Sequence, residues 1–489
     1  MTETKPPMSN AHRKALPSAD RVQLKLLPPA TLALLTLVSR VLCRGSVYWA
    51  DGPAHIRSIL EKVYVIQPPG YWLFNRIAGL FPNPITAISV MNIVFSVAAV
   101  VVFYYSALFF TGRRSAFLAA LAYSSIFYIW FSGEVHSTYA SQALFPVATF
   151  YALLRYDRDN ASWMLWLAAF LFAAGAGLRP SDGAFLLPML VYFSAARLPR
   201  KRAALFLAVS VALCLAWVIP TALAYGNSVS GLPGVGAYMS KIVKVRSITA
   251  GVNAKSIANI VRYGVPLLVA FWPVLIVAVS NVIHDWGDWR IRMMLLWILP
   301  GSLFFTLSYM SNAPYLNFLS AAVLLLAVSS PRMMAVTAVW NSVFFLSFSP
   351  TPSQRLVVQV WDSYATQYTR YGIEHQWWPN LSKLVARSVD DGVVPEMPGK
   401  SSSAQEWRAE ISVIAAEWMN SRDFPSQASA SKRLPQADKS FDLVILSDGT
   451  EHRGRKHMLL HEDKRVGANV CVRVPLEYTL LMEDEHRRP

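Results

Sequence analysis

The stretch YWADGPAHIRSILEKVYVIQPPGYWLFNRIAGLF, residues Tyr48–Phe81, separates the first strongly apolar run of the chain from the second. Asp51 lies near its start, beside a tryptophan, and an amphipathic segment leads on to the sequence Gln67-Pro68-Pro69-Gly70. The two prolines fix φ and remove two backbone donors, so they stiffen the return to the membrane. Holding a carboxylate at a membrane surface costs free energy, and ionisable residues in such positions usually have a function. We therefore interpret Asp51 as a candidate catalytic base at the outer face of a membrane.

A purely structural interpretation of Asp51 remains open. The residues after it are apolar at helical spacing, at Ile56, Ile59, Leu60 and Val63. Aspartate immediately before such a pattern is a frequent helix N-cap. Apolar surroundings would instead make the carboxylate a stronger base.

The composition indicates a polytopic membrane protein. The chain has 489 residues, of which 54% are hydrophobic and 15% charged, and its mean hydropathy is +0.34. Soluble domains average about 25% charged residues. Apolar runs of roughly 17–25 residues, long enough to cross a bilayer, recur through the first 350 positions. Three dispersed cysteines, Cys43, Cys214 and Cys471, predict neither a disulfide framework nor a zinc site.

The order of the apolar runs predicts about eleven spans and an all-α polytopic membrane domain at 26–349. The spans are expected at 26–42, 85–110, 115–131, 137–154, 163–178, 184–196, 203–225, 260–282, 291–309, 315–329 and 333–348. The net charge of +16 is concentrated in alternate short loops, which is how membrane orientation is set and does not indicate nucleic acid. The positive-inside rule places the tail 1–25 in the cytoplasm, and loops 43–84 and 226–259 outside. We expect the protein in a bacterial inner or plasma membrane.

The last part of the chain, 350–489, changes character. Its apolar runs shorten, and charges and Pro/Ser clusters appear. A helix is expected at 404–420 from its apolar stripe, and short strands at 441–447 and 470–474. We expect a small extracytoplasmic α/β domain here.

Two groups of polar residues accompany Asp51 on the predicted outer side. Glu134 and His136 follow the third span, which suggests a polar site shared with Asp51; a solvated loop pair is the alternative. Region 183–284 contains no Asp or Glu, yet its outer loop carries Lys241, Lys244 and Arg246. Unpaired cations outside oppose the positive-inside trend and suggest a lipid phosphate as partner, the alternative being general attraction to anionic headgroups.

Other catalytic motifs have little support. Asp157-Arg158-Asp159 has the D-x-D spacing of some metal sites, but it occupies a short cytoplasmic turn, and we discount it. The sequence contains no P-loop, HExxH or GxSxG element that would indicate an ATPase, zinc protease or serine hydrolase.

Several elements together resemble the GT-C membrane glycosyltransferases, in particular the branch that includes the transmembrane O-mannosyltransferases of the DUF2723 type. They are Asp51, Gln67-Pro68-Pro69-Gly70-Tyr71, Met91-Asn92, Gly133-Glu134-Val135-His136 and Gly177-Leu178-Arg179-Pro180. The likeness is good over 41–192 and weaker over 260–330, and it implies a GT-C-like fold for the membrane domain at 26–349. The chain departs from the pattern where Ala54 and His55 replace a second acidic residue, and where Gln67 replaces a more frequent His.

The resemblance implies inverting transfer of a sugar from a polyprenyl-phosphate carrier to a glycan, lipid or protein acceptor on the outer face. It implies Asp51 as the base, with Glu134 beside it as a second catalytic residue. His136 would bind acceptor or sugar, and Arg179, Lys241, Lys244 and Arg246 would bind phosphate. His55 and Gln67, at the two departures, are further candidate substrate-binding residues. No cofactor is named by the motifs, and a divalent cation is left open.

Two rival functions remain. A transporter or lipid flippase would show inverted repeats and ionisable residues inside its spans; no half-to-half symmetry is visible in the sequence. A non-catalytic membrane scaffold would predict that Asp51 and Glu134 lie apart in the fold.

Overall fold

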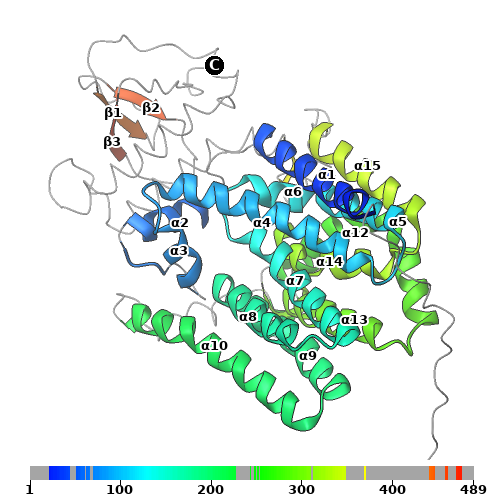
Figure 1. Cartoon of the computed structure of the whole chain (residues 1–489). Coiled ribbons are helices and arrows are strands. Elements are labelled where there is room, and N and C mark those ends of the chain that lie inside the picture. Colours follow the sequence, from blue (N-terminus) through cyan, green and yellow to red (C-terminus); the bar gives the residue numbers. More distant parts are fainter. Residues whose placement is uncertain are drawn as a thin grey trace, which may run out of the picture.

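The computed structural model in Figure 1 is dominated by a bundle of helices. It describes residues 21–43, 51–60, 62–65, 70–226, 243, 247–248, 251–252, 254–309, 312–347, 368–370, 440–445, 457–460 and 470–475. The α-helices are α1 Arg21–Leu42, α2 Asp51–Leu60, α3 Trp72–Ala78, α4 Pro84–Ala107, α5 Arg113–Ser125, α6 Phe127–Glu134, α7 Tyr139–Asp159, α8 Ser162–Leu178, α9 Pro180–Arg197, α10 Arg200–Gly226, α12 Ala254–His284, α13 Trp289–Leu303, α14 Asn317–Leu326 and α15 Pro331–Ser347. A π-helical turn, η3 Phe304–Ser308, extends α13, and a 3₁₀ turn, η4 Ala313–Leu316, precedes α14.

Every predicted span coincides with a helix or a pair of successive helices. The third span is bent: α5 and α6 meet at 60°. Within the described residues, four helices are long and apolar enough to cross a membrane, or five if the bent pair counts as one span, and three further apolar helices are shorter. The fold is therefore mainly helical and apolar, while the number of eleven spans remains a prediction.

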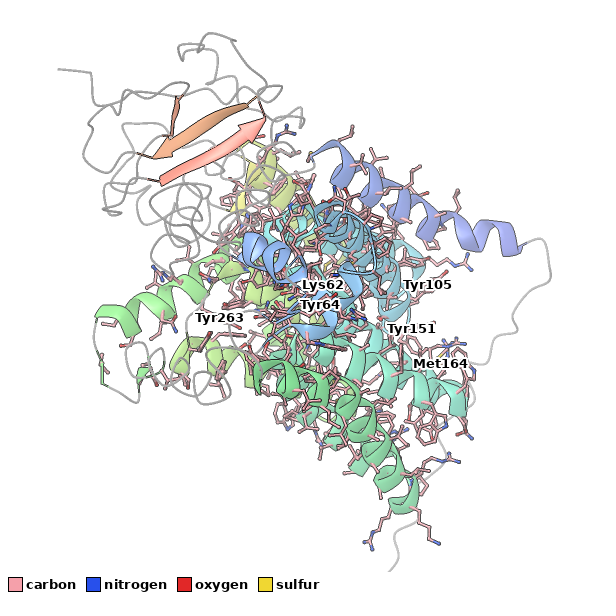
Figure 2. The ribbon with its side chains drawn as sticks, turned by 90° about the vertical axis from the view of Figure 1, so that its left-hand side faces the viewer. Lys62, Tyr64, Tyr105, Tyr151, Met164 and Tyr263 are labelled. Atoms are coloured by element: carbon pink, nitrogen blue, oxygen red, sulfur yellow. The ribbon has the colours of Figure 1, made fainter. Side chains whose placement is uncertain are left out.

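Aromatic and small residues hold the bundle together. α4 packs on α7, where Tyr105 and Tyr151 lie side by side with ring centroids 6.3 Å apart (Figure 2). α5 packs against α15 and α4 and carries fully buried alanines such as Ala116 and Ala119. Small residues of this kind allow membrane helices to approach closely. α10 lies at the rim of the bundle in Figure 1, and only 11% of its apolar window is buried. An apolar helix so little covered by protein is suited to face lipid.

The basic turns gather at one end of the bundle, which we call the basic end. The Arg197 side chain pairs with Asp157 at 2.6 Å, and its guanidinium lies 4.9 Å from the ring centroid of Trp289. Arg290 lies over Phe110 at 5.2 Å. Turns after α4, α7, α9 and α12 thus meet, as the predicted alternation of loops requires. Which side of the membrane this end faces remains a prediction.

The carboxylates at the basic end form ion pairs with arginines. Asp157 of the D-x-D sequence pairs with Arg197, and Asp159 pairs with Arg155 at 2.7 Å and with Arg158 at 2.8 Å. In the turn before α13, burial acts to raise the pKa of Asp288. Hydrogen bonds from the Arg290 side chain and backbone outweigh it and lower that pKa. Asp288 caps the start of α13, and the two aspartates of the D-x-D sequence each pair with arginine.

Three short strands follow the helices in sequence. β1 Ser440–Ile445 pairs in parallel with β2 His457–Leu460 and antiparallel with β3 Val470–Pro475, which gives the order β2-β1-β3. Strands were expected at two of these places. The expected helix at 404–420 lies outside the described residues, and an α/β domain at 350–489 remains a prediction.

Candidate functional site

The site is built around a short non-helical stretch, residues 135–138, that interrupts the helical structure between α6 and α7. We call this interruption the Glu134 break. α6 ends at Glu134, residues 135–138 are not helical, and α7 starts at Tyr139. Glu134 is 3% exposed and His136 is 2% exposed. The alternative that these are solvated loop residues is therefore wrong. A buried carboxylate needs compensating charge or hydrogen bonds. We therefore expect neighbouring elements to hold this stretch in a fixed conformation.

The start of α4 holds the break in place. The Ser89 hydroxyl and His136 Nε2 are 2.9 Å apart, and Asn92 Nδ2 donates to the Val135 carbonyl oxygen at 2.7 Å. Asn92 belongs to the Met-Asn element noted in the sequence. Its side chain fixes the backbone immediately after Glu134, so the element has a positioning role here.

The first turn of α2 lies directly on His136. A Cβ built on Gly52 would lie 2.6 Å from the His136 carbonyl oxygen and 3.3 Å from its Cβ. Asp51 is the first residue of α2 and precedes this contact. The backbone of Asp51 therefore lies next to the break that carries Glu134 and His136, contrary to what the scaffold alternative predicts.

This contact predicts the effect of a methyl group at position 52. Gly52→Ala must push the start of α2 away from His136, and we expect roughly 1–3 kcal/mol of destabilisation from the overpacking. The matched control is Gly264→Ala in α12, where a Cβ meets nothing within 4 Å and should be neutral or slightly stabilising. Thermal unfolding of the two purified variants checks this; equal melting temperatures would contradict the contact.

His55 connects α2 with α3. It is 1% exposed, its Nδ1 lies 2.6 Å from Asn75 Oδ1, and its ring packs against Tyr71 and Phe74. Asn75 in turn donates to the Ser58 hydroxyl at 2.9 Å. The position of His55 is thus that of a side chain holding the two short helices of the opening loop together; its substrate-binding role remains a proposal.

The Pro-Pro-Gly-Tyr element ends in an unusual backbone. Gly70 has φ of 112°, and a Cβ there would lie 2.9 Å from Thr221 and Tyr225 of α10. Only glycine adopts this conformation without strain. Tyr71 follows with φ of 56°. The close approach to α10 aims the ring of Tyr71 towards the turn between α8 and α9.

Arg179 lies at that turn, enclosed by aromatic rings. Its guanidinium carbon is 4.4, 5.1 and 5.6 Å from the ring centroids of Tyr139, Tyr315 and Tyr71. The side chain is 5% exposed. Cation–π contacts of this kind are strongest where water is excluded. Arg179 therefore connects the opening loop, α7 and η4 at one point.

A buried carboxylate accompanies Arg179. Asp182 Oδ1 lies 3.9 Å from Arg179 Nε and accepts from Gln142 Nε2 at 2.8 Å. Arg179 Nη1 donates to the Thr138 hydroxyl at 2.9 Å, and Thr138 closes the break that begins after Glu134. The Glu134 break and the Arg179 turn are consequently parts of one polar cluster at the end of the bundle opposite the basic end.

The remaining predicted residues cannot be placed. Gln67, Lys241, Lys244 and Arg246 lie outside the described residues, and the side chain of Asp51 is likewise not described. As for a divalent cation, no group of three or more His, Cys, Asp or Glu side chains within the described ranges is arranged to hold a metal ion.

The sequence patterns missed three buried residues of the cluster. Arg40 of α1 and Asp182 of α9 are 0% and 1% exposed, and Asn317 donates to the Ser132 hydroxyl at 2.7 Å. Arg40 and Asp182 carried a usable signal, since ionisable residues within or next to apolar runs are expensive and usually functional. Asn317 carried none, because an asparagine at the start of a span is common.

Comparison with known proteins supports the resemblance seen in the motifs. Residues 67–223 match a family described as dolichyl-phosphate-mannose-protein mannosyltransferase. This stretch resembles GT-C membrane glycosyltransferases. It covers about a third of the chain and includes Gln67, Glu134, His136 and Arg179, whereas Asp51 and the cations at 241–246 lie outside it. No curated protein matches the chain.

Two solved structures of an oligosaccharyltransferase from Archaeoglobus fulgidus are distantly similar. One is tethered with an acceptor peptide and the other, AglB, is in complex with an inhibitory peptide and a dolichol-phosphate. Each is 12% identical with a TM-score of 0.44; they cover 80% and 88% of this chain, and 59% and 63% of their own. The chain thus spans about three fifths of their length, and so distant a likeness carries no argument about its activity.

Proposed function

We propose that the protein is an integral-membrane glycosyltransferase that moves a sugar from a polyprenyl-phosphate carrier to an acceptor on the outer face of the membrane. The observation that carries the proposal is the meeting of the start of α2, the Glu134 break and the Arg179 turn in one cluster. The family match over residues 67–223 supports it. The description of the matching family makes a mannosyl donor and a protein acceptor the first pair to test.

The proposed reaction is an inverting displacement at the sugar's anomeric carbon. The acceptor hydroxyl loses its proton to the Asp51 carboxylate while its oxygen attacks that carbon. The bond from the carbon to the phosphate oxygen breaks, and the electron pair leaves with the polyprenyl phosphate. Charge grows on the phosphate as this bond breaks, so cations placed there lower the barrier.

Each predicted residue has a place in this proposal. Glu134 and His136 orient the sugar or the acceptor at the break. Arg179, together with Lys241, Lys244 and Arg246, contacts the phosphate. His55 and Gln67 shape the wall of the opening loop. The N-terminus would lie in the cytoplasm and residues 350–489 outside.

The experiment is to incubate the purified full-length protein with polyprenyl-phosphate hexoses and an acceptor mixture. We expect release of polyprenyl phosphate together with a product of inverted anomeric configuration. Release by none of the donors, from protein that is folded and embedded in lipid, would reject the proposal. Movement of the donor between leaflets without bond cleavage would instead favour the flippase alternative.

A further inference from the structure

One buried charge near the site is not explained by any of these roles. Arg40 lies near the end of α1 and is 0% exposed. Arginine stays protonated in proteins, so it brings a full positive charge into the packed bundle. Such a charge is strongly unfavourable unless other groups compensate it.

The hydrogen bonds of Arg40 fix its side chain but do not neutralise it. Nη2 donates to the Ser124 carbonyl oxygen at 2.7 Å, in the last turn of α5, and Nη1 donates to the Ser39 hydroxyl at 3.2 Å. The guanidinium also lies 5.0 Å from the ring centroid of Trp130 on α6. A helix C-terminus and an indole face both favour a cation, yet each supplies only a partial charge. Nε has no hydrogen-bond partner among the described residues.

The route of the side chain leads to Glu134. A Cβ built on Gly133 would lie 2.8 Å from Arg40 Nε and 2.9 Å from its Cδ. The arginine therefore passes directly over Gly133, and glycine is needed there to give it room. Glu134 is the next residue, and its carboxylate attracts Arg40 electrostatically. Glu134 therefore brings a full negative charge to bear on the buried arginine, where the other contacts supply only partial charges.

We infer that Arg40 is a positioning residue whose charge keeps Glu134 an ionised, immobile carboxylate at the break between α6 and α7. The inference about the pair stands on packing and charge; its consequence for catalysis rests on the proposed function. An ionised carboxylate accepts hydrogen bonds and donates none. Glu134 would then hold a hydroxyl or stabilise positive charge that develops on the sugar ring in the transition state, and it would not serve as an acid.

Other groups face Glu134 besides Arg40. Cys43, just after α1, interacts electrostatically with Glu134, with Arg40 and with Arg370, and Arg370 Nη1 donates to Cys43 Sγ at 3.5 Å. His136 lies two residues further along the break. Arg370 adds a second positive charge on this side, so the pair is tested by removing Arg40 and Glu134 separately and together.

A double-mutant cycle on the full-length protein tests the pair without any assay of activity. Arg40→Gln should lower the melting temperature by roughly 5–10 °C, because it removes a buried positive charge that attracts the Glu134 carboxylate. Adding Glu134→Gln should recover at least half of that loss, and Arg40→Lys should lose less than Arg40→Gln. If the two losses simply add in the double variant, the inference is wrong. It is equally wrong if Arg40→Gln cannot be recovered folded and the double variant cannot either.

The matched control is the exposed pair Arg155 and Asp159 at the basic end, where the side chains are 32% and 31% exposed. Neutralising either partner there should shift the melting temperature by no more than about 1–2 °C, since surface pairs contribute little. A coupling as large as that of Arg40 and Glu134 would show that the effect is not specific to the site.

The pH profile of transfer gives the second readout. In Arg40→Gln the acidic limb of the profile should move up by at least about one pH unit, because Glu134 loses the charge that keeps it ionised. Arg40→Lys should restore the limb. A uniform drop in rate with an unchanged profile would mean a merely structural role. Absence of transfer by the wild-type protein would reject the proposed function. The melting-temperature cycle would still test whether Arg40 and Glu134 are coupled.

Discussion

Replacing Asp51 by asparagine abolishes sugar transfer and leaves the protein folded in the membrane: this is the first result we expect. A positioned general base contributes about 10²–10⁴-fold to a rate, so the turnover number should fall by at least 100-fold. The asparagine has the same shape and still caps or begins α2, so the structural alternative predicts little loss. Transfer is measured as release of polyprenyl phosphate by wild-type and variant protein at equal amounts.

The control for this experiment is Asp159→Asn at the basic end. That carboxylate is held by Arg155 and Arg158 on the surface, far from the proposed chemistry along α7. It should retain nearly full transfer. Unchanged transfer in Asp51→Asn would remove the base role from Asp51 and reduce its part in the fold to that of a helix start.

The second large effect is expected at Arg179. Arg179→Gln removes a cation from among the rings of Tyr71, Tyr139 and Tyr315 and takes away the arginine nearest to the buried Asp182 carboxylate. Removing one member of a buried charge pair costs about 3–5 kcal/mol. The melting temperature should fall on the order of 10 °C, and transfer should be lost with it.

Two variants separate charge from packing at Arg179. Adding Asp182→Asn should recover part of the stability, because the uncompensated carboxylate is gone, while transfer should stay absent. Arg197→Gln is the surface control: Arg197 is 38% exposed in its pair with Asp157, and its loss should cost no more than about 1 kcal/mol. Arg179→Gln that melts like the wild type would contradict the buried pair.

Much of the helical architecture follows from the apolar runs. A segment in lipid must form all its backbone hydrogen bonds within itself, and an α-helix does so. The runs at 137–154 and 203–225 became α7 and α10 with ends shifted by a few residues. The bend between α5 and α6 could not be predicted in this way. The bend lies at Ile126, and residues 115–131 contain neither proline nor glycine that would predict it. Hydropathy does not distinguish a straight span from a bent one.

The sequence predicted several of the polar residues near the span ends that belong to the cluster. It did not predict how they pack against one another. Glu134, His136 and Arg179 were expected on one side, and they do lie in one cluster. Their burial was not expected, since a sequence cannot show that α2 covers the break through Gly52 or that Tyr315 returns to Arg179 from far along the chain. The prediction that Lys241, Lys244 and Arg246 bind phosphate remains untested.

The most direct test of one composite site is photolabelling. A polyprenyl-phosphate sugar that carries a photoreactive group on the sugar is bound to the full-length protein, irradiated, and the labelled peptides are identified by mass spectrometry. We predict labels in residues 51–60 and 132–139, suppressed by an excess of unlabelled polyprenyl phosphate. Labels confined to the lipid-facing helix α10, and unaffected by the competitor, would contradict the account.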